Sequence, residues 1–216
     1  MGAQVEIVSI NVGQRRRLEG RSFNGETGIF KEPVAGPVEV RELGLEGDAI
    51  VHTKVHGGPD QAVYVYRQED YDWWSAELDR LLSPGTFGEN LTVAGLPSPG
   101  AVIGSRLVFD NVVLEATAPR IPCNTFAARM NDTAFIKRFM RAGRPGFYCR
   151  VVTPGALIAG ERFEVQEYAG DPVTTVEMFR DWHRRLGGEE IRRLLAVPID
   201  LRSRDYLEVK LTELEG

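Results

Sequence analysis

The sequence predicts a mainly β protein, a β-barrel with a few helices, followed by a small C-terminal extension of three helices. Short apolar or alternating runs recur along the first 168 residues, and Gly and Pro residues separate them. Helical periodicity dominates only after residue 171. Many short strands with turns between them are typical of barrels and sandwiches rather than of doubly wound α/β sheets. We therefore expect a β-barrel domain over residues 1–168 and a helical extension over residues 171–216.

Seven segments have the character of strands. Residues 5–12 alternate between the two faces of a strand, as expected for a strand with one buried face. Ala62-Val-Tyr-Val-Tyr66 is a continuous apolar run of the kind that is buried on both faces. The remaining strand candidates are residues 90–93, 102–109, 112–117, 148–152 and 156–165.

Helical spacing of apolar residues marks five further segments. Two interrupt the strands, at residues 68–82 and 124–141, and Gly143 is placed to end the second of them. The extension contains the other three, at residues 174–186, 189–195 and 203–214, and the first of these begins with capping-box spacing. The segment 68–82 carries an apolar stripe that we expect to face the core: Tyr71, Trp74, Leu78 and Leu81.

Composition limits the class of protein. The chain has 216 residues, 43% hydrophobic and 26% charged, which is typical of a globular protein, and its formal net charge of -5 disfavours coating of a nucleic-acid polymer. No run approaches the ~18 apolar residues that span a bilayer, and the first residues do not resemble a secretion signal. We therefore expect a cytoplasmic protein whose partners include neither a membrane nor a nucleic-acid polymer. Two cysteines are too few for a disulfide framework, a four-thiolate zinc site or an iron–sulfur cluster.

Four polar, glycine-rich loops contain the candidate functional residues. The first runs from Lys54 to Gln61, and its adjacent Gly57 and Gly58 allow backbone N–H groups to converge on an anion, although an ordinary tight turn is the simpler interpretation of this loop taken alone. Lys54 and His56 would add charge or hydrogen bonds there. The other loops are Pro84 to Leu91 with Asn90, Arg120 to Thr125 with Cys123, and Gly143 to Tyr148 with Arg144.

The two cysteines differ in their surroundings. Cys149 lies inside an apolar run, which predicts a buried and inert thiol. Cys123 lies near Arg120 and just before a predicted helix, and both features favour a thiolate. From the residues alone, Cys123 is either a hydrolase nucleophile with His56 as base and Asn90 as orienting group, or a ligand to a soft metal held by a larger molecule.

These loops, in this order, resemble the MOSC family, named for the C-terminal domain of molybdenum-cofactor sulfurase. The resemblance rests on Gly47-Asp48, His56-Gly-Gly-Pro-Asp60, Phe87-Gly-Glu-Asn-Leu91, Pro119-Arg-Ile-Pro-Cys123 and Gly146-Phe-Tyr-Cys-Arg-Val-Val152. It covers residues 1–168, and the tail resembles the three-helix extension of the YiiM-like branch. One position departs from the family pattern, because Val55 stands where a second His often precedes His56.

The resemblance implies a MOSC-type β-barrel that binds the molybdenum cofactor, with Cys123 as the thiolate ligand to molybdenum. It implies reduction of N-hydroxylated compounds, such as hydroxylaminopurine bases, to amines, with His56 or Asp60 as proton donor. Because the sequence carries no cysteine cluster, haem-attachment motif or nucleotide-binding fingerprint, we expect a separate electron-donating reductase as partner. The resemblance also carries family-level associations with pyridoxal phosphate and with hydroxylaminopurine resistance. A non-catalytic cofactor carrier and a sulfur-transfer protein with a persulfide on Cys123 remain open. The implied cofactor-binding residues are Lys54, His56, Gly57, Gly58, Asn90, Arg120, Asn124 and Arg144.

Overall fold

The computed structural model of the chain describes residues 5–53, 56–98 and 100–216, and its largest element is an eight-stranded sheet. All neighbouring strands in this sheet are antiparallel except β7 and β8, which pair in parallel. In order across the sheet, the strands are β13 (Glu164–Gln166), β9 (Arg106–Val108), β10 (Val113–Pro119), β11 (Phe147–Thr153), β7 (Val63–Arg67), β8 (Leu91–Ala94), β1 (Glu6–Gly13) and β4 (Lys31–Pro33).

Two smaller sheets complete the β structure. A three-stranded sheet has the order β12 (Gly155–Leu157), β5 (Val38–Arg41) and β6 (Gly44–Leu45), and β2 (Arg16–Glu19) pairs with β3 (Asn24–Thr27) in a separate arm. These short strands occupy much of the stretch between residues 14 and 50, where the sequence pattern did not indicate any strand. Their alternation is too short to stand out, and β2 and β3 carry mostly exposed polar side chains.

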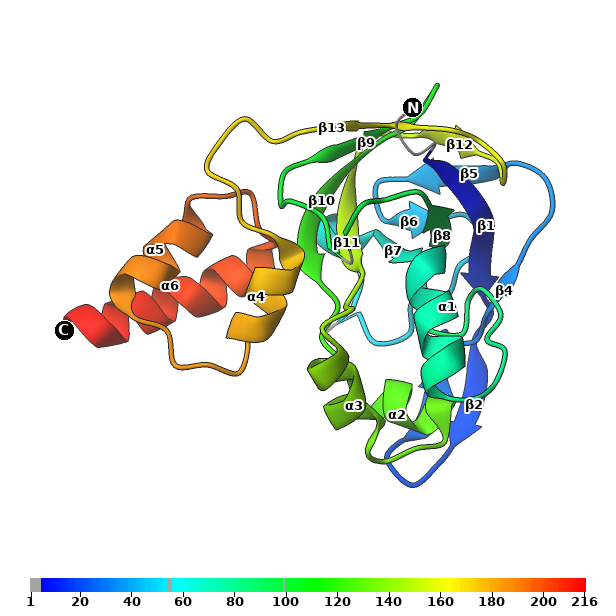
Figure 1. Cartoon of the computed structure of the whole chain (residues 1–216), viewed down its shortest axis with the longest axis horizontal. Coiled ribbons are helices and arrows are strands. Elements are labelled where there is room, and N and C mark those ends of the chain that lie inside the picture. The colour runs from blue at the N-terminus through cyan, green and yellow to red at the C-terminus, as the bar shows by residue number, and fades with distance from the viewer. Residues whose placement is uncertain (1–4, 54–55, 99) are drawn as a thin grey trace.

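The helices gather in two groups (Figure 1). The first group, α1 (Gln68–Glu77), α2 (Asn124–Met130) and α3 (Phe135–Ala142), covers the lower part of the sheet in this view. The second group, α4 (Thr175–Asp181), α5 (Gly188–Leu195) and α6 (Leu201–Glu215), lies together at one side. None of the helices among the described residues has the length and apolar character needed to cross a membrane.

The fold class predicted from sequence is confirmed: a strand-rich body with a few helices and a small three-helix extension. The paired strands do not form a continuous closed barrel among the described residues, since β13 and β4 are edges of the sheet. Backbone hydrogen bonds nevertheless bring the sheet round on itself. The N–H of Ile7 donates to the carbonyl of Glu161 at 2.9 Å, and that of Gly160 donates to the carbonyl of Ile7 at 2.7 Å.

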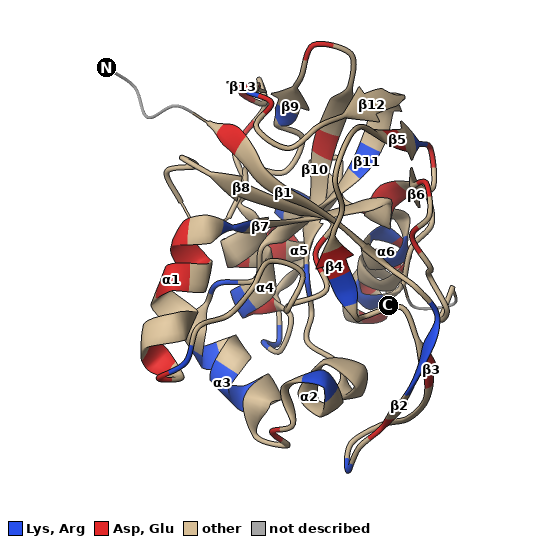
Figure 2. Ribbon diagram, turned by 90° about the vertical axis from the view of Figure 1, so that its right-hand side faces the viewer, with Lys and Arg blue, Asp and Glu red and all other residues tan. Residues whose placement is uncertain are grey.

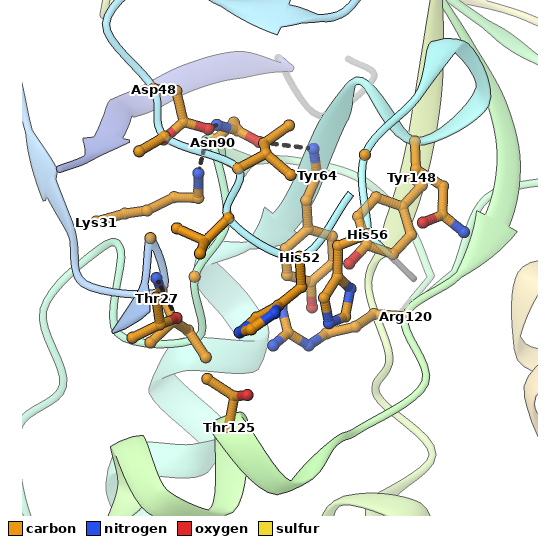
Figure 3. A pocket seen from close by; sticks show the side chains of 18 of the residues that line it. Thr27, Lys31, Asp48, His52, His56, Tyr64, Asn90, Arg120, Thr125 and Tyr148 are labelled. Atoms are coloured by element: carbon orange, nitrogen blue, oxygen red, sulfur yellow. Dashed lines mark hydrogen bonds and ion pairs between the residues drawn. The ribbon is translucent and has the colours of Figure 1, made fainter. Parts of the chain in front are cut away.

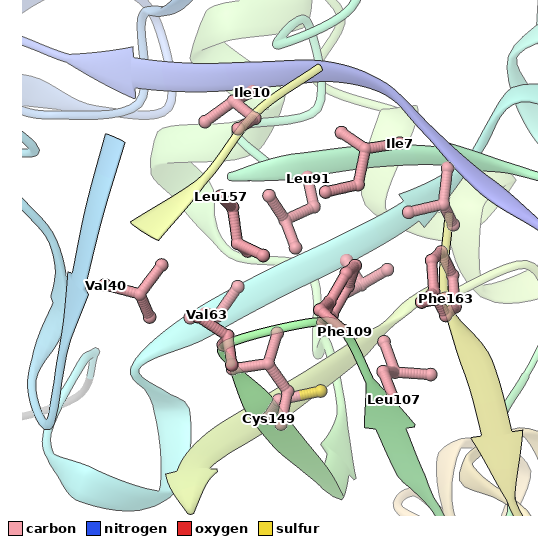
Figure 4. Close-up of a cluster of buried hydrophobic side chains, with 14 of the residues drawn as sticks. Ile7, Ile10, Val40, Val63, Leu91, Leu107, Phe109, Cys149, Leu157 and Phe163 are labelled. Atoms are coloured by element: carbon pink, nitrogen blue, oxygen red, sulfur yellow. The ribbon is translucent and has the colours of Figure 1, made fainter. Parts of the chain in front are cut away.

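Apolar side chains form one cluster inside the curled sheet, one under α1–α3 and one within the extension. The first is mainly aliphatic, includes Phe109, Phe147 and Phe163, and encloses Cys149 (Figure 4). The second is mainly aromatic. Figure 2 shows charged residues on the helices and on several strands, including the interior strands β10 and β11, whereas β8 and the middle of β1 carry none. This pattern places the apolar strands at the centre of the molecule.

Several predicted boundaries differ from those in the structure. The segment 124–141 is two helices, because Asn131 adopts a left-handed conformation with φ 52° and ends α2. Gly143 ends α3 in the same conformation, as predicted. Helix α1 ends at Glu77 rather than residue 82, so Leu81 is exposed instead of facing the core. The segment 156–165 contains two strands separated by a turn at Gly160, whose φ is 88°.

Candidate functional site

A polar cavity lies between the loops that follow β3, β6, α1 and β10 (Figure 3). It encloses about 640 Å³ of space free of protein atoms, including its open mouth. The residues that line it and carry polar side chains are Thr27, Lys31, Asp48, His52, His56, Gln61, Tyr64, Asn90, Arg120, Cys123, Thr125 and Tyr148. All four loops singled out in the sequence therefore contribute residues to the cavity, the fourth of them through Tyr148.

Cys123 enters the cavity from the start of α2. It is the N-cap residue of that helix, with extended backbone at φ -127° and ψ 172°, and its side chain is only partly buried. The N-terminus of a helix presents free N–H groups and a partial positive charge. The Cys123 sulfur is thus the soft ligand that this cavity offers, beside the hydroxyl of Thr125.

Arg120 is a buried cation in the same cavity. The residue is 5% exposed, and its guanidinium lies 4.5 Å from the Phe126 ring centre and 5.0 Å from that of Tyr64. Among the described residues no carboxylate lies within ion-pair distance, and the buried Nε has no hydrogen-bond partner. Contact with two aromatic faces recovers part of the desolvation cost of a charge, but not the whole of it. The site is therefore electrostatically incomplete and is suited to an anion.

His56 lies beside Arg120 (Figure 3). Burial, together with the charges of Arg120 and Arg202, lowers the pKa of His56 to about 4, so the imidazole is neutral near pH 7. The adjacent Gly57 has φ 70°, and a Cβ atom there would come within 2.9 Å of the Ile50 side chain. Glycine is thus required at this position by both conformation and space.

Asn90 is held by the surrounding structure and has little freedom to bind a ligand. Its Oδ1 accepts from the backbone N–H of Tyr64 at 3.1 Å, and its Nδ2 donates to Asp48 at 2.9 Å. Asp48 also accepts from the N–H of Gly13 at 2.7 Å and pairs with buried Lys31. Burial lowers the pKa of Lys31 although Asp48 opposes that shift. This network fixes the wall of the cavity. Its carboxylate compensates the charge of Lys31, whereas no carboxylate among the described residues pairs with Arg120.

Four of the predicted site residues lie elsewhere or outside the described residues. Arg144 pairs with Asp70 and lies over the Trp73 ring at 4.7 Å, away from the cavity. Asp60 pairs with Arg150 at 2.9 Å and accepts from the N–H of Leu201 at 2.8 Å. Asn124 is exposed on the first turn of α2. Lys54 falls outside the residues that the structure describes.

The remaining predicted residues are near or in the cavity. His56, Gly57, Asn90, Arg120 and Cys123 line it directly. Gly58 follows Gly57 with φ 85° and does not line the cavity itself.

Several polar lining residues did not emerge as candidates from sequence reasoning, among them Lys31, Gln61 and Tyr148. Lys31 belongs to a short strand without a motif, so nothing in its neighbourhood signals the site. Tyr148 was assigned to a strand, where its alternation with Phe147 and Cys149 places it on the opposite face from the core. That alternation is the signal that would have identified it.

Comparisons with known proteins agree with this fold and identify the family. The MOSC domain family matches residues 52–164. YflK of Bacillus subtilis (strain 168) is 37% identical over 159 residues, which cover 74% of this chain and 72% of YflK. A protein named Reductase from Gibberella moniliformis is 31% identical over 157 residues, 70% of this chain but 28% of that protein.

The whole chain also resembles a solved structure, that of YiiM from Geobacillus stearothermophilus. The TM-score is 0.79 at 25% sequence identity, and the match covers 96% of this chain and 99% of that one. The MOSC family is associated with the molybdenum cofactor in general, and the resemblance inferred from the four loops is confirmed. The chain belongs to the MOSC family and has the fold of its YiiM-like members.

Proposed function

We propose that the cavity binds the molybdenum cofactor and that the protein reduces N-hydroxylated compounds, such as hydroxylaminopurine bases, to amines. The observation that carries the proposal is the pairing of an uncompensated, buried guanidinium at Arg120 with a partly buried thiol at Cys123 in one cavity. The cofactor matches both groups, since its pterin phosphate is an anion that suits the guanidinium and its metal is a soft cation that suits the thiolate.

The residues of the cavity fit such a group. Arg120 would compensate its negative charge, and its guanidinium geometry suits a phosphate. Cys123 would supply the protein thiolate to molybdenum. Gly57 and Gly58, whose positive φ values favour glycine, carry no side chain, so that a ligand can approach the loop backbone closely.

When bound, the cofactor supplies a two-electron redox centre. The overall reaction is R–NHOH plus two electrons and two protons, giving R–NH₂ and water. Of the two proton donors inferred from the family resemblance, the geometry favours His56, because Asp60 is engaged by Arg150 and by the start of α6. The pKa of His56 is depressed partly by the positive charge of Arg120. An anion bound at Arg120 would offset that charge and raise the pKa, which would enable His56 to hold and deliver a proton near neutral pH.

The electrons require a second protein on this proposal. The chain has two cysteines, of which Cys149 is enclosed in the apolar core, so it cannot hold an iron–sulfur cluster of its own. We therefore propose a separate reductase as the physiological donor. Full turnover by the purified protein with NADH alone would contradict this part of the proposal.

The decisive experiment compares protein from cofactor-competent cells with protein from cofactor-deficient cells. With reduced methyl viologen as donor, only the former is expected to convert a hydroxylaminopurine to the aminopurine, as measured by chromatography. Molybdenum retention without turnover would instead indicate a carrier. A reductant-sensitive mass increase on Cys123 would indicate sulfur transfer, and hydrolytic activity in cofactor-deficient protein would indicate a cysteine hydrolase.

A further inference from the structure

A second cavity lies between the helical extension and the sheet, next to the first one. It encloses about 700 Å³ of space free of protein atoms, including its opening, and we call it the extension groove. Both cavities are lined by His56, Gln61 and Tyr148, so these three side chains form the boundary between them. A molecule in the extension groove would therefore have one end beside the proposed cofactor site.

The walls of the extension groove differ chemically from those of the first cavity. Ile121, Met178 and Trp182 contribute large apolar surfaces. Trp182 is 39% exposed, which leaves a broad aromatic face available to a ligand. Such walls suit the flat ring of an aromatic molecule.

The groove also contains a carboxylate oxygen without a partner. Asp200 is 2% exposed and is the N-cap residue of α6, where one oxygen, Oδ1, accepts from the N–H of Ser203 at 3.2 Å. The other oxygen, Oδ2, is buried and makes no hydrogen bond within the described structure. Helix capping explains the first oxygen and not the second. A buried acceptor left unpaired destabilises the ligand-free protein, and a hydrogen bond from a ligand N–H group would remove that cost.

The nearby cation does not satisfy this oxygen. Arg202 also lines the groove, but its guanidinium donates to the carbonyls of Gly57 and Thr53 and to Oε1 of Gln61. Burial raises the pKa of Asp200, and the neighbouring Asp60 contributes to the shift. The groove therefore favours a ligand that donates hydrogen bonds or carries positive charge, whereas the first cavity favours an anion.

We propose that the extension groove is the substrate-recognition site and takes a planar aromatic amidine or an amino-substituted N-heterocycle. The ring lies against Trp182, and its N–H groups donate to Oδ2 of Asp200. The N–hydroxyl end then points past His56 and Tyr148 toward the first cavity. That the end pointing toward the first cavity is an N–hydroxyl group rests on the proposed function. Binding of the ring and of its N–H groups in the extension groove does not.

Binding can be measured without cofactor by titrating benzamidine into the full-length protein from cofactor-deficient cells, using calorimetry. Benzamidine is a planar aromatic cation with N–H donors, and benzoate is its charge-reversed counterpart. We expect wild-type protein to bind benzamidine and not benzoate. Asp200→Asn keeps an N-cap acceptor but places a donor at the Oδ2 position, so it should weaken binding at least tenfold. Asp205→Asn, an exposed change on the same helix, should alter binding by less than twofold.

Equal affinity in the wild type and in Asp200→Asn, or no binding by the wild type, would overturn the proposal. Should Asp200→Asn fail to fold, Trp182→Ala tests the same groove from its exposed wall, and we expect at least a fivefold loss of benzamidine affinity. Unchanged affinity in that variant would equally overturn the proposal. If the protein binds benzamidine through Asp200 but never retains molybdenum, the result contradicts the proposed function and leaves this inference intact. If the wild-type protein reduces N-hydroxylated compounds and Asp200→Asn has the same KM and the same benzamidine affinity, the result contradicts this inference and leaves the proposed function intact.

Discussion

The two cysteines of the chain mark two regions that are buried by different means. Cys149 lies in the aliphatic cluster inside the sheet, with 0% exposure, and burial raises the pKa of its thiol (Figure 4). Cys123 lies at the wall of a polar cavity, beside a guanidinium that no carboxylate within the described structure compensates. The first region contains no unpaired charge, whereas the second holds a buried cation that has no ion-pair partner among the described residues.

This contrast separates residues that stabilise the fold from residues kept at a cost to it. Packing satisfies every requirement of Cys149, because its neighbours are apolar and the thiol needs no strong partner. Arg120 is desolvated without an ion pair, which destabilises the ligand-free protein. Uncompensated charge at a cavity wall is therefore the clearest structural sign of function in this molecule.

The largest difference is expected between serine substitutions at the two cysteines. Cys123→Ser removes the proposed thiolate ligand and should lower reductase activity more than ~100-fold, since even outer-shell groups of metal sites cost about 10–100-fold. Its melting temperature should stay near that of the wild type, because the side chain is partly exposed. Cys149→Ser should keep its activity per folded molecule but lose about 1–3 kcal/mol of unfolding free energy, because a hydroxyl is placed among apolar groups. Steady-state kinetics and denaturant titration measure the pair, and the reverse pattern would contradict the assignment.

A second test compares two arginines. Arg120→Met should raise the unfolding free energy of the ligand-free protein by roughly 1 kcal/mol, because relief of desolvation exceeds the lost contact with aromatic rings. It should also abolish stabilisation by added phosphate. Arg144→Met should lower the unfolding free energy by about 2 kcal/mol, because buried Asp70 loses a partner. Denaturant titrations with and without phosphate measure both variants. Destabilisation by Arg120→Met would show that this charge is compensated after all.

Protonation of His56 gives a third test. Its pKa is about 4 in the folded protein, below the ordinary value of 6.5, so the unfolded chain binds the proton more readily. The contribution of neutral His56 to the unfolding free energy is therefore fully present above pH 6.5 and is lost as the pH falls toward about 4. The loss should be about 2 kcal/mol, less than the full shift implies because the imidazole is partly exposed. His56→Gln should flatten the stability profile in that window, and an unchanged profile would show that other groups cause it.

The smallest expected effect concerns the contact between the extension and the loop that carries His56. Arg202 donates to Gly57 and Gln61 at 2.9 and 3.0 Å. Arg202→Ala should lower the stability of this loop by about 1–2 kcal/mol, seen as faster amide exchange at His56 and Gln61. It should also raise the pKa of His56, since one of the nearby positive charges is removed. Arg193→Ala, which breaks an exposed ion pair in the extension, serves as the control and should change neither.

Local patterns predicted the elements with strong periodicity and missed the weak ones. The run from residue 62 to 66 and the capping box at Thr174 have counterparts in β7 and α4, because apolar continuity and side-chain caps act within a few residues. Strands β2–β6 escaped prediction because each has only two to four residues, too few for a periodic pattern to stand out. Two of them also depend on partners farther along the chain, since β4 pairs with β1 and β5 pairs with β12. Closure of the sheet through Ile7 and Glu161 depends on the same long-range pairing.

The candidate site was predictable where a motif and the cavity coincide. Cys123, Arg120 and the loop of His56 come from segments whose residue choices are unusual for turns, and the structure brings them together. Arg144 has the same appearance in sequence, but its pairing with Asp70 is decided by how α1 packs against the loop after α3. Lys31 and Asp200 enter their cavities through contacts between segments far apart in sequence, which no local pattern encodes.

Molybdenum content tests the central claim most directly. Wild-type protein and the Cys123→Ser and Cys149→Ser variants, all purified from cofactor-competent cells, are compared by elemental analysis per mole of folded protein. The account predicts molybdenum in the wild type and in Cys149→Ser, and little or none in Cys123→Ser. Wild-type protein without molybdenum, or equal content in all three proteins, would contradict the claim that the Cys123 cavity holds the cofactor.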